Sequence, residues 1–142
     1  MTAEYFAKLI AESQIEEAQR VTRVRSRIYG YTYTDDGVKI VEREAEVIRS
    51  VVGQLASIPF LPCWKILEAI AQDFRLANPQ VRSRSNKLFS AASLAKLASN
   101  CTYAALELNQ LGLLVRIQNY PPIISEKEYR VAWTRLKREN LA

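Results

Sequence analysis

Apolar side chains recur at helical spacing along two long stretches in the middle of the chain. In residues 42–56 they form one stripe, and polar side chains occupy the opposite side. The apolar stripe consists of Val47, Ile48, Val51, Val52 and Leu55, and the polar side of Glu44, Glu46, Arg49 and Ser50. Pro62 suits the first position of a second helix, which the pattern extends to about Ala77. Its inward side is expected to be Cys63, Ile66, Leu67, Ile70, Ala71 and Phe74.

Shorter or weaker patterns predict three further helices. Ser90 is suited to cap a helix in which Leu94, Leu97 and Ala98 lie on one side. Ser125 and Glu128 form a capping box at the start of the last helix. That helix is expected to turn Tyr129, Trp133 and Leu136 inward and Arg130, Arg135, Lys137 and Arg138 outward. A weakly amphipathic helix is predicted from about Thr2 to Arg23.

Two stretches favour strands. Aromatic and β-branched residues in 29–34 lead into Asp35-Asp36-Gly37, which predicts a hairpin returning along 38–41. Gly30 is expected to supply a backbone conformation or a close approach that a side chain would forbid. A second strand pair, 106–109 and 113–118, is predicted around Gly112, although 105–111 also fits a helix.

These elements predict a mainly α fold with small β-hairpins, of the α+β class, with a helix-turn-helix-like element in its helical core. The expected organisation is an N-terminal helix and basic linker over residues 1–27, followed by one domain over 28–142. With 49% hydrophobic and 25% charged residues, the composition is that of an ordinary globular protein. Neither a signal peptide nor an apolar run of about 20 residues is evident, so a cytoplasmic protein is expected.

The side chains with strong chemistry are few. The chain has no histidine, and its two cysteines, Cys63 and Cys101, lie in apolar patterns that favour reduced structural thiols. A disulfide or metal pair is the alternative. No glycine-rich phosphate loop and no arrangement typical of a serine nucleophile occurs. We therefore expect no metal, no cofactor and no catalysis by this chain alone.

The positive charge is grouped. The net charge is +5, and the cations gather around Arg20–Arg27, Arg75–Lys96 and Arg135–Arg138. The loop 82–87 carries three cations and no acid, and the following short helix presents Ser93, Lys96 and Asn100 on its polar side. Such side chains reach phosphates and base edges. The same residues also fit an ordinary solvated surface.

Three motifs, in order, resemble the recombinase domain of large serine recombinases. They are Tyr29-Gly30-Tyr31 with an Asp-Gly turn and Glu44-Ala45-Glu46-Val47-Ile48-Arg49; the short helix 90–97 with Asn100 and Tyr103; and Pro121-Pro122-Ile123-Ile124-Ser125 with Glu126-Lys127-Glu128-Tyr129. The resemblance covers roughly residues 23–137. Ala104-Ala105 stand where the family usually has glycine, Phe89 where it has tryptophan, and 78–87 in place of a glycine-containing loop.

The resemblance implies sequence-specific binding of double-stranded DNA, as a non-catalytic domain of a site-specific recombinase. The catalytic domain with its serine nucleophile and the zinc-ribbon domain have no counterpart in this sequence. A recombinase catalytic domain and a homo-oligomer on DNA are expected as partners. The expected DNA-binding residues are Arg23, Arg25, Arg27, Arg82, Arg84, Lys87, Ser93, Lys96 and Asn100.

Two other functions fit the same sequence. One is a helical protein-interaction module with a docking surface along Tyr5, Phe6 and Leu9. The other is a free-standing DNA-binding regulator that does not associate with a recombinase.

Overall fold

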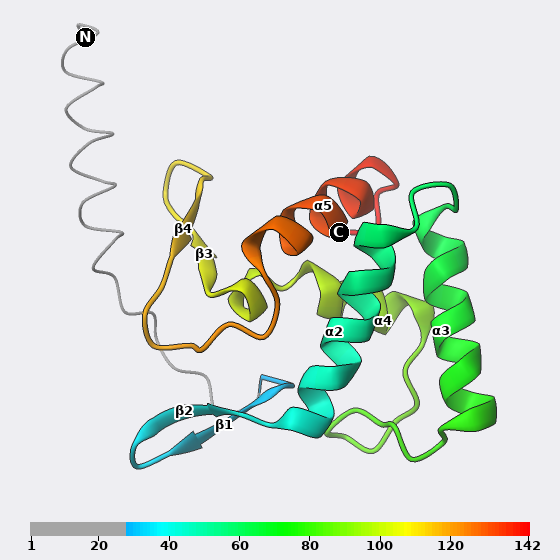
Figure 1. The fold of residues 1–142 in the computed structure, drawn as a ribbon, viewed down its shortest axis with the longest axis horizontal. Coiled ribbons are helices and arrows are strands. Elements are labelled where there is room, and N and C mark those ends of the chain that lie inside the picture. Colours follow the sequence, from blue (N-terminus) through cyan, green and yellow to red (C-terminus); the bar gives the residue numbers. More distant parts are fainter. Residues whose placement is uncertain (1–27) are drawn as a thin grey trace, which may run out of the picture.

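The computed structural model describes residues 28–142 as four helices, one short 3-10 helix and two hairpins (Figure 1). The predicted N-terminal helix and the basic linker lie outside the described residues. In chain order the elements are β1 (Tyr31–Thr34), β2 (Gly37–Ile40), α2 (Glu42–Ser57), α3 (Cys63–Ala77), α4 (Ala91–Ser99), η1 (Cys101–Ala104), β3 (Leu106–Leu108), β4 (Leu114–Arg116) and α5 (Glu126–Arg138).

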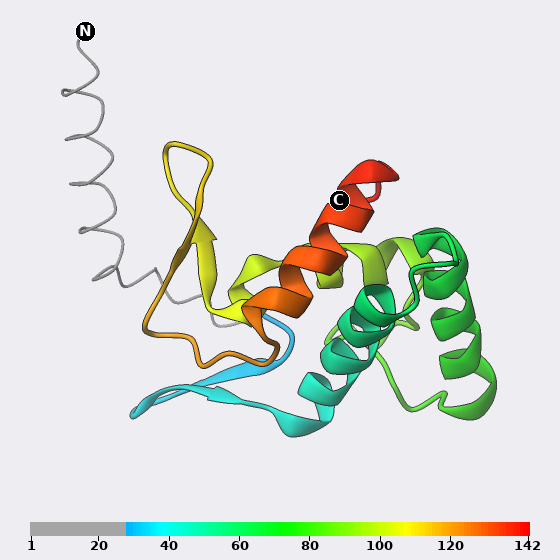
Figure 2. The ribbon, with the colours of Figure 1, turned by 45° about the horizontal axis from the view of Figure 1, so that its top comes forward.

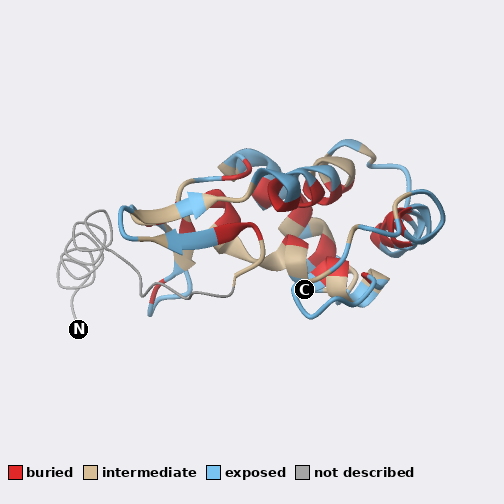
Figure 3. Cartoon of the chain, turned by 90° about the horizontal axis from the view of Figure 1, so that it is seen from below, coloured by how far each residue is buried: buried red, intermediate tan, exposed pale blue. Residues whose placement is uncertain are grey.

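The helices gather on one side of the molecule, and both hairpins extend from the other side (Figures 1 and 2). Helix α2 packs against α5, α3 and α4. The apolar stripes predicted for α2 and α3 are all buried, and they face the other helices in Figure 3. The mainly α fold with small hairpins is confirmed. Helix α3, the connector 78–90 and α4 form the helix-turn-helix-like element, with a connector much longer than a tight turn.

Hairpin β1–β2 is attached to the core through Tyr31. The strands pair antiparallel from Tyr31 opposite Ile40 to Thr34 opposite Gly37. The Tyr31 side chain is 2% exposed, and its hydroxyl donates to Pro121 O at 2.7 Å. Gly30 has φ +98°, and a Cβ there would lie 2.7 Å from Ile48 Cδ1. The prediction of a close approach at Gly30 is therefore confirmed.

The second hairpin also matches its predicted strands. Leu106 pairs with Arg116 and Leu108 with Leu114, so the alternative of a helix over 105–111 is wrong. The turn into β3 requires a left-handed backbone, with Ala105 at φ 56° and ψ 44°. Its N–H donates to Thr102 O, and its own carbonyl accepts from Ile117 N–H, each at 2.9 Å.

The end of α5 secures the turn between α2 and α3. Helix α3 begins after Pro62 without a side-chain cap of its own, and Glu139 accepts the Cys63 N–H through both carboxylate oxygens at 2.9 Å. Four residues earlier, the Arg135 guanidinium donates to the carbonyls of Leu55, Ile58 and Leu61. The two side chains thus satisfy the end of α2 and the start of α3. The prediction that Arg135 lies on the basic exterior is wrong, because carbonyls 74 to 80 residues earlier in the chain engage it.

The remaining predictions for α5 hold in part. Ser125 caps the helix by accepting the Glu128 N–H at 3.1 Å. The Glu128 carboxylate accepts a hydrogen bond from the Ser125 hydroxyl but does not reach the Ser125 backbone, so the predicted capping box is only half formed.

Both cysteines are free; Cys63 is buried and Cys101 is partly buried. No helix of the described part of the chain is long and apolar enough to cross a membrane.

Candidate nucleic-acid interface

Residues 83–87 close into a tight turn just before α4. Asn86 N–H donates to Ser83 O, and Ser83 N–H donates to Lys87 O, each at 2.9 Å. Asn86 takes the left-handed conformation at φ 61°, which asparagine tolerates better than most residues. Arg82 is fixed beside the turn, because its Nη1 donates to Asn86 O at 3.2 Å and its Nε to Pro79 O at 3.1 Å. The turn is therefore internally bonded.

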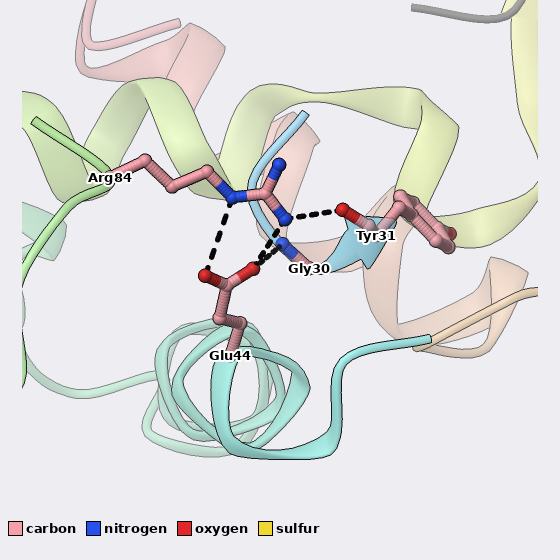
Figure 4. A network of polar contacts seen from close by, with 4 residues as sticks. All are labelled: Gly30, Tyr31, Glu44 and Arg84. Carbon is pink, nitrogen blue, oxygen red and sulfur yellow. Dashed lines mark hydrogen bonds and ion pairs between the residues drawn. The ribbon is translucent and has the colours of Figure 1, made fainter. Parts of the chain in front are cut away.

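Arg84 joins this turn to the first turn of α2 and to β1 (Figure 4). Its Nη2 donates to Glu44 Oε1 at 2.7 Å and also to Tyr31 O, and its Nε donates to Glu44 Oε2 at 3.3 Å. Glu44 Oε1 accepts a further hydrogen bond from Gly30 N–H at 2.8 Å. The side chain of Glu44 is 10% exposed and that of Arg84 33% exposed. The ion pair is thus largely sheltered from water.

The prediction that Glu44 lies on the solvent side of α2 is wrong. The helical pattern assigned it there because its neighbours on that face are polar, whereas its partner lies 40 residues later in the chain. Arg84 was expected to contact phosphate. Its Nε and Nη2 atoms donate instead to Glu44 and to Tyr31 O. Nη1 is the one guanidinium nitrogen without a hydrogen bond to the described residues.

Helix α4 follows directly and presents a small polar face. Ser90 and Ser93 form a reciprocal capping box, in which each hydroxyl accepts the other residue's backbone N–H. Lys96 is exposed, while Leu94, Ala95 and Ala98 are buried. Asn100 caps η1, because its Oδ1 accepts from Thr102 N–H at 3.1 Å. Ser93 and Asn100 therefore both have local structural roles, and Lys96 is the predicted contact on this helix whose side chain makes no hydrogen bond or ion pair with described residues.

The structure brings some of the predicted DNA-binding residues together and not others. Arg82, Arg84 and Lys87 lie together at the turn beside α2. Ser93 and Lys96 lie on α4, the helix that follows the turn, and Asn100 is the residue directly after it. Arg23, Arg25 and Arg27 lie outside the described residues. The third group of cations is partly engaged elsewhere, with Arg135 on helix-end carbonyls and Lys137 Nζ 4.1 Å from the centre of the Trp133 ring.

Arg43, in the first turn of α2, is a further exposed cation that the sequence did not single out. Burial and the Glu44 charge raise the pKa of Tyr29 to about 12, while the charges of Arg43 and Arg84 lower it. Arg43 was overlooked because its neighbours in sequence, Glu42 and Glu44, are acids, whereas Glu44 turns inward and leaves Arg43 exposed.

Burial raises the pKa of the tyrosines beneath the turn, Tyr31 and Tyr103, well above its usual value. Burial likewise raises the pKa of Cys63 to about 11, and the hydrogen-bonded Glu139 carboxylate adds to the shift. Among residues 28–142 no group of three or more cysteines and acids is placed to hold a metal ion.

Comparison with known proteins gives no match by sequence, but several solved structures match the fold. No family model matches the chain, and no curated protein does. A large serine recombinase bound to DNA, "Crystal Structure of a LSR-DNA Complex", aligns at TM-score 0.60 and 17% identity. A structure concerning the "Listeria innocua prophage attP site" aligns at TM-score 0.53 and 21% identity. The chain has the fold of one part of these proteins.

The alignments take in nearly all of this chain and a fraction of each relative. They cover 94% of the chain and 39% of the first structure, and 92% of the chain and 51% of the second. The chain thus spans about two fifths of one relative and half of the other. The fold expected from the resemblance to the recombinase domain is confirmed.

Proposed function

We propose that this chain binds double-stranded DNA as the recombinase-type domain of a site-specific serine recombinase. The surface formed by the turn 83–87, the flanking Arg82 and the exposed face of α4 would meet the DNA. Lys87 and Arg82 would contact phosphates, and Lys96 would approach the bases in the major groove. Arg23, Arg25 and Arg27 would also contact the DNA backbone.

One observation carries this proposal: the net charge of the chain resides in a single stretch. Between Asp73 and Glu107 there is no acid, and there are five cations, Arg75, Arg82, Arg84, Lys87 and Lys96. The chain has 20 Lys and Arg against 15 Asp and Glu, so outside this stretch 15 of each remain and balance. Of the five cations, Arg84 alone has an ion pair with a described residue. Such uncompensated charge favours a polyanion partner.

The rest of the proposal follows from the two DNA-related structures with this fold. A recombinase domain acts beside a catalytic domain, so we propose a covalent or non-covalent partnership with a recombinase catalytic domain, and assembly of copies on DNA. Residues 28–142 would form the DNA-binding domain, and 1–27 the helix and linker that lead to the catalytic domain. The chain itself would perform no catalysis, need no cofactor and act in the cytoplasm.

A salt titration of DNA binding tests the proposal. If about six phosphates are neutralised, the logarithm of the binding constant should fall with the logarithm of salt concentration at a slope of roughly −5. Fluorescence anisotropy with a duplex of about 30 base pairs measures this slope. A slope near zero would rule the function out. Selection of bound sequences from a random DNA pool would then identify the target site.

A second candidate function is a protein-interaction module. Phe60 is 81% exposed and Trp64 is 48% exposed, and both lie near the turn between α2 and α3. Exposed aromatic side chains four positions apart in the sequence are typical of contact surfaces between proteins. This function predicts no salt-dependent binding of DNA, so the same titration separates the two.

A further inference from the structure

We infer that Glu44, an acid, is a positioning residue for DNA binding: through Arg84 it holds the turn 83–87 in place, so that Arg82 and Lys87 face the nucleic acid. This inference rests on the proposed function and adds a role for two residues that do not have to contact DNA at all. The negatively charged Glu44 carboxylate would thus favour the binding of DNA, which is itself negatively charged.

The first support is that Arg84 is the turn's polar connection to the body of the domain. The hydrogen bonds of Ser83, Ser85, Asn86 and Lys87 stay within the turn. Those of Arg82 go to Asn86 O and Pro79 O, which belong to the same connector. Among the described residues, every hydrogen bond that leaves 82–87 for another element is made by the Arg84 guanidinium, to Glu44 and Tyr31 O.

The second support is that Glu44 is a rigid anchor. It lies in the first turn of α2, where the positive end of the helix dipole favours a carboxylate. Its Oε1 is also held by Gly30 N–H at 2.8 Å, and Gly30 is packed so tightly that a Cβ would clash with Ile48 and Ile123. The carboxylate therefore keeps one orientation, and two-point pairing transmits that orientation to the guanidinium.

The third support is that the turn carries the cations but has little apolar anchorage of its own. Residues 84–88 are all exposed, and Leu88 is 40% exposed. The core is reached again at Phe89, which is 5% exposed and meets the Tyr29 ring edge-on. Without the Arg84 tether, the turn would be held at Phe89 and at Val81 alone. Its cations would then sample many positions, and their binding to phosphate would cost more entropy.

The sign of one substitution separates positioning from simple electrostatics. Glu44→Gln keeps the shape of the side chain and removes one negative charge near the DNA surface. If charge alone mattered, DNA binding would strengthen. If Glu44 positions the turn, binding weakens, because the neutral amide cannot hold the guanidinium by charge-assisted hydrogen bonds.

The experiment compares four proteins by fluorescence anisotropy with a random-sequence duplex of about 30 base pairs over a salt series. They are the wild type, Glu44→Gln, Arg84→Lys and Glu42→Gln. Glu42 is the matched control: it lies on the same helical turn as Glu44, but its side chain is 68% exposed and pairs with Arg49. Arg84→Lys keeps the positive charge but loses the planar fork.

The inference predicts that Glu44→Gln and Arg84→Lys each lower affinity about tenfold and make the salt slope shallower by about 2, close to 0.9 for each of two cations. Glu42→Gln should bind as tightly as the wild type or slightly more tightly. Hydrogen exchange should show faster exchange at the N–H groups of Ser83 and Asn86 in both weakened variants, with exchange within α2 unchanged. That local readout distinguishes a released turn from a globally unfolded domain.

The outcomes separate the two claims. If the wild type binds DNA and Glu44→Gln binds it as tightly as Glu42→Gln, the positioning role is overturned and the proposed function stands. If exchange in α2 rises together with exchange in the turn, Glu44 stabilises the whole domain and the positioning role is again overturned. If the wild type shows no salt-dependent binding, both the function and the role that depends on it fail.

Discussion

Ala105 is a residue in an unfavourable conformation. Its φ of 56° and ψ of 44° lie in the left-handed region, where a Cβ approaches the carbonyl oxygen too closely. Both its N–H and its carbonyl are hydrogen-bonded, so the backbone cannot relax without breaking the link between η1 and residue 117. The conformation is imposed by the surrounding fold.

Replacing this residue with glycine should therefore stabilise the protein. Ala105→Gly removes the left-handed strain of about 1 kcal/mol or more, against a smaller loss from the more flexible unfolded chain and a partly buried methyl group. We expect a net gain of about 0.5–1 kcal/mol in the free energy of unfolding, measured by urea denaturation. The control is Ala104→Gly, one residue earlier in η1, where the buried methyl group is lost without relief of strain. Equal destabilisation by both substitutions would show that Ala105 is not strained.

The roles of charged residues were the hardest to predict from sequence. Glu44, Arg84 and Arg135 each sit in a local pattern that indicates exposure, yet each has a partner 40 or more residues away. Apolar periodicity reports which face of a helix is buried, but it carries no information on which distant group a buried charge meets. Lys87 and Lys96, which have no such partner among the described residues, lie exposed as predicted.

At the scale of elements, the sequence predicted far more. The stripes of α2 and α3 were correct residue by residue, because each helix packs a single continuous face. The Asp-Gly turn placed the first hairpin, and Ser125 placed the start of α5. The local pattern did not predict which distant side chains form hydrogen bonds with the unpaired backbone groups at the helix ends. Helix α3 has no side-chain cap from its own N-cap residue, and Glu139, just after α5, accepts the Cys63 N–H instead.

Because the Glu139 carboxylate caps α3, the stability of the fold should depend on pH. Burial raises the pKa of the Glu139 carboxyl, but the hydrogen bonds from Cys63 and Trp64 and the Arg135 charge outweigh burial, so its pKa lies below the ordinary value. A group with a lowered pKa in the folded state adds stability above its unfolded pKa of about 4.3, and this is lost as the pH falls through the folded pKa.

Glu139→Gln should accordingly cost about 1 kcal/mol at pH 7, the usual magnitude for a helix cap. The difference from the wild type should shrink as the pH falls below about 4, because the unfolded chain then takes up a proton at Glu139 and the folded protein does so at still lower pH. Urea unfolding at pH 7 and at pH 3 measures it. Glu128→Gln on the same helix is a suitable control for a general effect of charge. A difference that persists unchanged at pH 3 would mean that the ionised carboxylate is not what caps α3.

For the molecule as a whole, the arrangement of charge is the feature that bears on function. The cations of the connector and α4 follow α3, which spans 15 residues, or roughly 20 Å of helix. Lys65 lies near the start of α3, while the connector begins at its end. A DNA duplex that meets the turn and α4 should thus leave the start of α3 uncovered.

Chemical modification of lysines tests this arrangement. With a random-sequence duplex present, reductive methylation should slow several-fold at Lys87 and Lys96 and stay unchanged at Lys65, as followed by mass spectrometry. Lys65 is a fair comparison because it too is exposed. Equal protection of all three lysines would indicate non-specific coating, and protection of Lys65 alone would place the DNA on a different face.

The Tyr31 hydroxyl has a consequence for how the polypeptide acquires its structure. It donates to the carbonyls of Thr102 and Pro121, which follow it by 71 and 90 residues. On a ribosome, the first strand must wait for most of the domain to be synthesised before its anchor exists. The hairpin can close early, but it cannot dock on the core until these carbonyls are present. Splitting the gene anywhere between the codons for Tyr31 and Thr102 would leave the hydroxyl on one fragment and both carbonyls on the other.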